Sequence, residues 1–429
     1  MRNNSILVWI SGLVLLLIPQ RNEIPRILLV GLVLVTYAFL NRRQMAVINF
    51  GLSGLLYFIT VLGYLNLQDL NSFQGTSLRF ALPQESIHAT VHIFLLASLL
   101  VVTFPKSKIA STPEVMIRTR VQGFSYTTLL VSVIPLLIGL CDFGIQGLLH
   151  RNTHLIGSQT SYLAHLTGPL SMLALGYLSA KGRNTKGVLK FFVLFIVILY
   201  AAYFLALSTR RIAIIPFAVL MLYFQHRKKF RYLIGIPLAV YSSLYLMNLV
   251  LVVRGELNQG LSFYIQALYA HNFLKIDLLS VFQNFIVSFQ ITGITAFILD
   301  GYPLRDFFIE INPLPGNFAG WYQILFRHSI NSYTPTSTIG DLANYGQIVF
   351  TSSIVLVSLL GRRLSSMLLD AISNRDTLLG GLVVSGTIMT ALNSLQYSLR
   401  SSMRLFYYTF FIFIFVLIFR KFFNKKSLL

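Results

Sequence analysis

Arginines indicate the chemistry that this chain could carry. Arg210 and Arg211 stand in Ala206-Leu-Ser-Thr-Arg-Arg-Ile-Ala213, where no carboxylate is near, and Arg254 ends a long apolar stretch. A guanidinium presents a planar fork of N–H donors that fits phosphate oxygens. The later part of the chain holds further candidates of the same kind: Arg305, Arg327, Arg400 and Arg404. Several such groups around one cavity would suit a diphosphate held at a membrane surface.

A second set of residues could move a proton. Asp341 stands in Pro335-Thr-Ser-Thr-Ile-Gly-Asp-Leu-Ala-Asn-Tyr-Gly346, where glycines permit a turn before a helix. We expect Asp341 to act as a general base or as the N-cap of that helix, and Glu256 is the second candidate for the base. His328 is either a catalytic group or a hydrogen-bonding surface residue.

Aromatic side chains in the same part of the chain could stack on sugar rings, or could serve packing alone. The predicted sugar-binding residues are Trp321, His328, Tyr333 and Tyr345. No metal is expected, because Asp142, His150, His154 and His165 match no zinc-ligand spacing. No cofactor is expected either, since no phosphate-binding glycine loop or dinucleotide fingerprint occurs.

The elements that must position these residues are membrane spans. The chain has 429 residues, of which 55% are hydrophobic and 11% charged, against ~25% charged in soluble domains. We predict an all-α polytopic membrane protein whose residues 1–429 form a single transmembrane domain. Its spans, about twelve in number, lie near 6–20, 25–40, 46–66, 88–105, 124–145, 162–180, 188–207, 212–225, 232–253, 345–361, 378–395 and 404–420.

Charge predicts the orientation of these spans. The formal net charge is +21, and the basic clusters, Arg362-Arg363 and the C-terminal tail Arg420 to Lys426 among them, fall on the cytoplasmic side if both termini are cytoplasmic. Basic loops on anionic lipid explain this charge better than nucleic acid does. Residues 254–344 then form one large external loop, in which a helix at about 283–299 is re-entrant or lies on the membrane surface.

The external arginines have a less specific interpretation. They could extend to lipid phosphates, or pair with carboxylates of the chain. The available carboxylates are Glu256, Asp300, Asp306 and Glu310.

Two of these segments resemble elements of the O-antigen (Wzy-type) polymerases, also called oligosaccharide repeat-unit polymerases. Ser208-Thr-Arg-Arg211 is similar to the family's Gly/Ser-x-Arg element, and Thr338-Ile-Gly-Asp-Leu-Ala-Asn-Tyr-Gly346 to its Gly-Glu-Leu-Tyr-x-Asn-Phe-Gly stretch. Asp341 stands where glutamate is usual, Ala343 where tyrosine is usual, and Tyr345 where phenylalanine is usual. The order of spans and the late external loop are also similar.

The resemblance implies a GT-C-like helical fold in the bacterial inner membrane. It also implies a metal-independent glycosyl transfer at the periplasmic face, between oligosaccharide units linked to undecaprenyl diphosphate, and a possible protein partner that regulates chain length. An O-antigen ligase is the first alternative. A flippase or transporter of lipid-linked oligosaccharide is the second, although no internal repeat or broken helix supports it.

Overall fold

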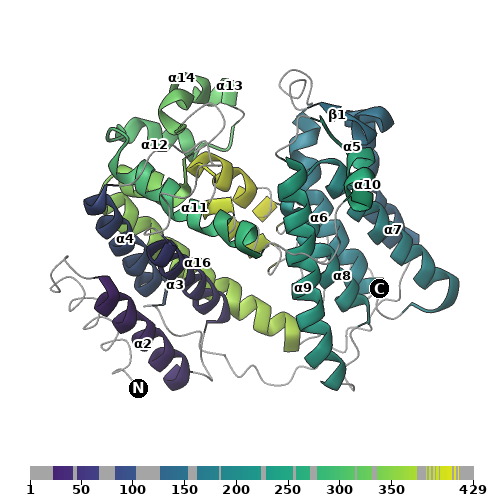
Figure 1. The fold of residues 1–429 in the computed structure, drawn as a ribbon, viewed down its shortest axis with the longest axis horizontal. Coiled ribbons are helices and arrows are strands. Elements are labelled where there is room, and N and C mark those ends of the chain that lie inside the picture. The colour runs from purple at the N-terminus through teal and green to yellow at the C-terminus, as the bar shows by residue number, and fades with distance from the viewer. Residues whose placement is uncertain are drawn as a thin grey trace, which may run out of the picture. The chain divides into compact units, whose positions relative to one another are not determined.

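The computed structural model describes most of the chain and shows it to be helical (Figure 1). The described residues are 23–41, 46–66, 83–102, 126–152, 162–182, 185–223, 229–254, 258–270, 278–314, 316–330, 336–373, 383, 386–387, 390–391, 393–395, 397–407, 410–411 and 414. Within these ranges, strands β1 (Arg151–Asn152) and β2 (Asn258–Gln259) form one short antiparallel pair.

Several helices are suited to a membrane by length and composition. Five described segments are long and apolar enough to cross one: Val47–Leu65, Gln84–Val102, Thr128–Leu149, Gly187–Ala206 and Gln347–Asp370. Shorter apolar helices cover Leu170–Ser179, Arg211–Tyr223, Pro237–Leu251 and Ile286–Phe297. These findings agree with a membrane protein.

The chain divides into two compact units. Unit 1 comprises Met1–Val115, Asn284–Asp370 and Gly386–Leu429, and unit 2 comprises Met116–Gln283 and Ala371–Ser385. The segment 254–344, expected as one external loop, therefore contributes to both units.

Unit 2 is built from apolar helices. They are α5 (Tyr126–Leu149), α6 (Tyr162–Gly182), α7 (Gly187–Ala206), the 3-10 helix η3 (Arg210–Ala213), α8 (Ile214–Tyr223), α9 (Lys229–Arg254) and α10 (Leu261–Ala270). Helix α5 packs along α6, and α9 packs along both η3 and α8. The hydroxyl of Ser243 on α9 donates to the carbonyl of Ala213 at 2.7 Å, which holds the end of η3.

Unit 1 contains α2 (Glu23–Asn41), α3 (Val47–Asn66), α4 (Gln84–Val102), α11 (Leu278–Phe297) and α16 (Gln347–Ser373) as its longer helices. Polar side chains join them in the interior. The side-chain amide of Asn49 on α3 donates to the carbonyls of Val101 and Ser358, each at 2.8 Å. A Cβ at Gly361 would lie 2.5 Å from Asn49 Oδ1. Small residues and buried amides thus allow α3, α4 and α16 to approach closely.

The short elements of unit 1 follow α11. They are α12 (Leu304–Glu310), α13 (Gly316–Ala319), α14 (Trp321–Ile324), the 3-10 helix η4 (Leu325–His328) and α15 (Thr338–Asn344). Figure 1 shows α12, α13 and α14 together at one end of the unit. Helix α11 supports them with a buried face that includes Phe289, Thr292 and Thr295. It is therefore a largely buried helix of unit 1, and its expected place as a re-entrant or membrane-surface helix stays a prediction.

The predicted spans compare well with the observed helices. The spans between residues 25 and 253, and the one near 345–361, each coincide with a described helix. The span near 6–20 lies outside the described residues, and those near 378–395 and 404–420 are described only in part. Arg362-Arg363 was expected in a loop, but both residues lie within α16, which continues to Ser373. Arginine is a good helix former, so a basic pair does not end a helix.

Candidate functional site

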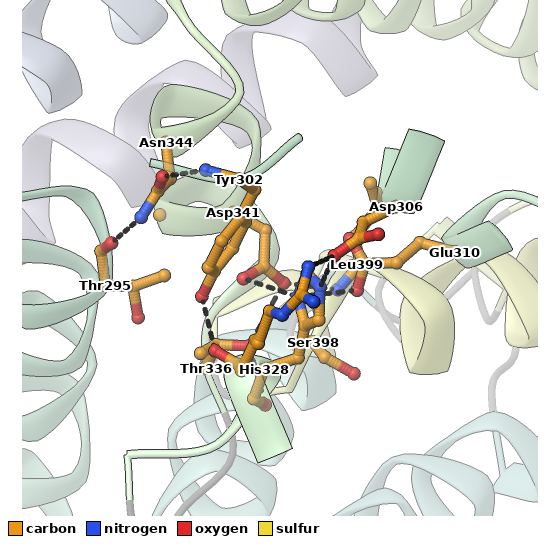
Figure 2. A network of polar contacts seen from close by, with 12 residues as sticks. Thr295, Tyr302, Asp306, Glu310, His328, Thr336, Asp341, Asn344, Ser398 and Leu399 are labelled. Atoms are coloured by element: carbon orange, nitrogen blue, oxygen red, sulfur yellow. Dashed lines mark hydrogen bonds and ion pairs between the residues drawn. The ribbon is translucent and has the colours of Figure 1, made fainter. Parts of the chain in front are cut away.

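Carboxylates converge on one imidazole at the short elements of unit 1 (Figure 2). His328 Nδ1 lies 3.4 Å from Glu310 Oε1 and 3.8 Å from Asp341 Oδ1, and His328 Nε2 lies 3.7 Å from Asp306 Oδ2. Each of these residues is at most 2% exposed. We call Asp306, Glu310, His328 and Asp341 the imidazole cluster.

Hydrogen bonds hold the Glu310 and Asp341 carboxylates through the oxygens that point away from His328. Glu310 Oε2 accepts a hydrogen bond from the hydroxyl of Tyr345 at 3.0 Å. Asp341 Oδ2 accepts one from the hydroxyl of Thr336 at 3.1 Å and one from the backbone N–H of Leu399 at 2.8 Å. The other oxygen of each carboxylate is left to face His328.

Local sequence explains how α15 presents Asp341. Ser337 is the N-cap, and its hydroxyl accepts from the N–H of Gly340 at 3.0 Å. A Cβ at Gly340 would lie 2.6 Å from the Cβ of Thr295, so only glycine lets α15 lie this close to α11. Thr338 adds a hydrogen bond from its N–H to the carbonyl of Tyr397 at 2.9 Å.

A second helix begins at the cluster. Residues 399–407 are helical, and the first N–H groups of a helix lack partners inside it. The N–H of Leu399 donates to Asp341, and that of Arg400 to Glu310. The positive end of this helix is therefore directed at the two carboxylates, which favours their charged form.

Burial nevertheless governs the protonation of this cluster. Loss of water raises the pKa of Glu310 well above its usual value, and the charge of Asp341 raises it further. Burial also raises the pKa of Asp341, although the nearby imidazole of His328 and the hydrogen bonds from Leu399 and Thr336 act in the opposite direction. The site holds carboxylates that are costly to keep charged without a counter-charge.

Arg327 connects the cluster to the surface. Its Nη1 donates to Asp306 Oδ2 at 3.1 Å, while its side chain is 44% exposed. Arg305, one residue before Asp306, is also exposed. Both are predicted diphosphate-binding residues, and both keep guanidinium surface that a ligand can reach.

Arg400 is placed differently from these exposed arginines. It is 1% exposed, and its guanidinium donates to the carbonyls of Ile309 and Leu314, each at 2.6 Å. Its guanidinium carbon also lies 5.4 Å from the centre of the Trp321 ring. This arginine holds the chain that follows α12, an arrangement that does not suit the diphosphate contact expected of it.

The aromatic residues of the segment mostly pack around the imidazole. The ring of Tyr302 lies 4.2 Å from that of His328, and the ring of Trp321 lies 5.4 Å from it. Tyr345 is partly buried and bound to Glu310. Burial and the nearby carboxylates raise the pKa of both tyrosine hydroxyls, so these remain neutral donors. Tyr333, also predicted to bind sugar, lies outside the described residues.

The remaining predicted arginines lie in unit 2. Arg210 and Arg211 begin η3, directly after a turn in which Ser208 has a φ of 48°. This left-handed conformation is uncommon for serine, and the hydroxyl of buried Tyr264 fixes it by donating to Ser208 Oγ at 3.1 Å. Arg254 is the last residue of α9, and Glu256 lies outside the described residues. The structure therefore gathers Asp341, His328 and Arg327 in one unit and these arginines in the other.

Two expectations for the cluster were wrong. Asp341 is not an N-cap of the following helix, because α15 forms a separate short helix capped by Ser337, and its carboxylate binds Leu399. His328 is not a surface residue, since it is 1% exposed. Glu310 was considered only as a partner for arginines, but it is central to the cluster. Its spacing of four from Asp306, which puts both on one helix face, was the available signal.

The cluster also contains a possible metal-ligand group, which the sequence spacing did not predict. Glu310, His328 and Asp341 each offer one ligand atom, and these atoms all lie within 4.8 Å of one another. The three residues come from different elements, α12, η4 and α15, so no short motif joins them.

Comparisons with known proteins give no relative for this chain. No family model, no curated protein and no solved structure matches it.

Proposed function

We propose that this chain is an O-antigen polymerase of the bacterial inner membrane. In this proposal it has about twelve spans in a GT-C-like arrangement with both termini in the cytoplasm. It joins oligosaccharide repeat units carried on undecaprenyl diphosphate, at the periplasmic face. The observation that carries the proposal is the half-exposed guanidinium of Arg327, which is fixed by buried Asp306 in the late segment expected to face the periplasm.

The reaction follows from what such a guanidinium can stabilise. The bond between the anomeric carbon of the donor sugar and the phosphate oxygen breaks, and its electron pair leaves with undecaprenyl diphosphate. A hydroxyl oxygen of the acceptor unit bonds to that carbon and loses its proton. Negative charge grows on the diphosphate, and a preorganised arginine in a poorly hydrated place stabilises it most. Arg327, helped by Arg305, takes this role without any metal at the reacting atoms.

The imidazole cluster positions Arg327 in this proposal. Asp306 contacts both Arg327 and His328, so the orientation of the guanidinium depends on the buried imidazole. Asp341 is fully buried with both oxygens directed at protein groups. It therefore acts as a positioning residue for His328, not as the base that contacts the acceptor hydroxyl.

A deletion strain of the source bacterium tests the proposal. Gel electrophoresis of its lipopolysaccharide should show the lipid A core carrying one repeat unit, where the parent shows a ladder of chain lengths. Reintroduction of the gene should restore the ladder. Loss of all surface repeat units would instead indicate the ligase or the flippase, and an unchanged ladder would remove the proposal.

A further inference from the structure

We propose that Glu310, His328 and Asp341 bind a divalent first-row transition-metal cation, with Zn²⁺ the best match. The cation would lie inside unit 1, joining α12, η4 and α15. This site goes beyond the proposed polymerase function, because the cation would touch neither the donor nor the acceptor oligosaccharide. Its role would be to hold the elements from which Arg327 reaches the surface.

The first support is a set of buried ligand atoms without hydrogen bonds. Glu310 Oε1, His328 Nδ1 and Asp341 Oδ1 are buried and have no hydrogen-bond partner. Nδ1 faces the two oxygens at 3.4 and 3.8 Å, beyond the ~2.9 Å of a good N–H···O bond. One N–H could also serve only one of the two carboxylates. Because an unsatisfied buried polar atom is costly, a cation among the three is favoured.

The spacing of these atoms fits a metal ion. Atoms separated by 3.4 Å, 3.8 Å and at most 4.8 Å have a common point about 2.4 Å or less from each. Metal bonds to imidazole nitrogen and carboxylate oxygen are typically ~2.0–2.2 Å for zinc, and somewhat longer for larger cations. A small inward movement of the side chains would complete the coordination, with water as the remaining ligand.

The groups around these atoms resemble the outer shell of a metal site (Figure 2). Tyr345 holds the second oxygen of Glu310, and Leu399 holds that of Asp341. His328 Nε2, the nitrogen away from the proposed cation, faces the Asp306 carboxylate at 3.7 Å. This distance is too long for a hydrogen bond. The same small inward movement would have to bring Nε2 to Asp306, and a carboxylate bonded there fixes the tautomer that leaves the other nitrogen free for metal.

Ligand chemistry selects the class of cation. Two carboxylates and a neutral imidazole supply a charge of −2, which a divalent ion neutralises. An imidazole suits zinc and its neighbours, whereas calcium and magnesium favour oxygen ligands alone. No thiolate takes part, so copper(I) is not favoured.

Metal content and thermal unfolding test the site without an activity assay. Protein purified in detergent and dialysed against excess ZnSO4 should retain about one Zn²⁺ per chain. EDTA should lower the unfolding midpoint of the wild type by about 5 °C, and Zn²⁺ should restore it. MnCl2 should give a smaller rise and MgCl2 none. His328→Ala should bind zinc at least about tenfold more weakly.

The matched control is His150→Ala, since His150 is exposed in unit 2 and bonds Ser262. It should bind zinc as the wild type does. The inference is overturned if the wild type retains no zinc and its thermal unfolding midpoint is the same with and without EDTA. It is also overturned if His328→Ala binds zinc as tightly as the wild type does. Polymer formed by a wild type that takes up no metal would refute only this site and leave the polymerase proposal standing.

Discussion

Unit 1 contains two buried charged clusters that are built in opposite ways. At the start of α2, Glu23 is fully buried, and its Oε1 accepts from Arg26 Nη1 at 3.2 Å and lies 3.1 Å from His88 Nδ1. Here one carboxylate meets two basic groups at hydrogen-bond distance. In the imidazole cluster, three carboxylates meet one histidine at longer distances.

This difference separates a structural arrangement from a candidate site. The Glu23–Arg26 pair neutralises itself, so removing one member should harm the fold. In the imidazole cluster the acidic groups outnumber the basic ones, and the buried atoms that face one another make no hydrogen bonds. Such an arrangement of buried carboxylates is typical of a functional site.

The largest expected effect on stability comes from breaking the Glu23–Arg26 cluster. Arg26→Ala leaves the Glu23 carboxylate buried without its guanidinium, and should cost about 3–5 kcal/mol of unfolding free energy. Unfolding of detergent-purified protein measures this cost. The control, Arg363→Ala, removes an exposed arginine from α16 and should change little. Equal unfolding of the two variants would remove the contrast between the clusters.

The next largest effect concerns Arg327. Arg327→Ala should reduce long-chain polymer by roughly 100- to 1000-fold, the usual consequence of losing one preorganised donor to a developing charge. Its stability should also fall, by about 1–3 kcal/mol, because the guanidinium is half exposed but the Asp306 carboxylate that it leaves is buried. Polymer is therefore compared at equal amounts of inserted protein. Arg327→Lys should give an intermediate yield, since an ammonium lacks the planar fork. Gels from the complemented deletion strain provide the measurement, and a full ladder from Arg327→Ala would contradict the assignment.

A backbone contact gives a third test. Gly340→Ala forces a methyl group against Thr295, which should cost about 1–3 kcal/mol and reduce polymerisation by moving Asp341. Gly176→Ala in α6 meets nothing within 4 Å, so it should be neutral or slightly stabilising. Thermal unfolding and polymer gels of both variants distinguish the cases. Equal behaviour would show that the approach of α15 to α11 is not critical.

The smallest effect is expected from neutral replacements inside the imidazole cluster. In metal-free buffer at neutral pH, Glu310→Gln and Asp341→Asn should each change the unfolding free energy by less than about 1 kcal/mol. Each amide keeps an acceptor for Tyr345 or Leu399 and removes a charge that burial disfavours. A loss as large as that of Arg26→Ala would mean that both clusters are ordinary ion pairs.

Helix positions could be predicted from the sequence because apolar length alone determines a span. For α3, α4 and α7, the ends predicted from hydropathy lie within a few residues of the observed ends. It could not show that α16 continues through Arg362-Arg363, since a loop and a polar helix end have similar composition there.

Only part of the candidate site could be predicted. Arg327, His328 and Asp341 were recognised by type, because arginine, histidine and an acid near glycines are useful in chemistry. The burial of His328 and Asp341, and the convergence of Asp306 and Glu310 on His328, depend on contacts between residues far apart in the chain. The N–H of Leu399 reaches Asp341 across 58 positions, which no local pattern encodes.

The most direct test of the polymerase proposal is a reconstituted reaction. Purified wild-type protein in lipid nanodiscs would be given only repeat units linked to undecaprenyl diphosphate, and products would be separated on a gel. We expect a ladder of lengthening chains and one undecaprenyl diphosphate released for each bond formed, with neither from Arg327→Ala and both from Arg363→Ala. Unchanged starting material with correctly inserted wild-type protein would contradict the proposed function.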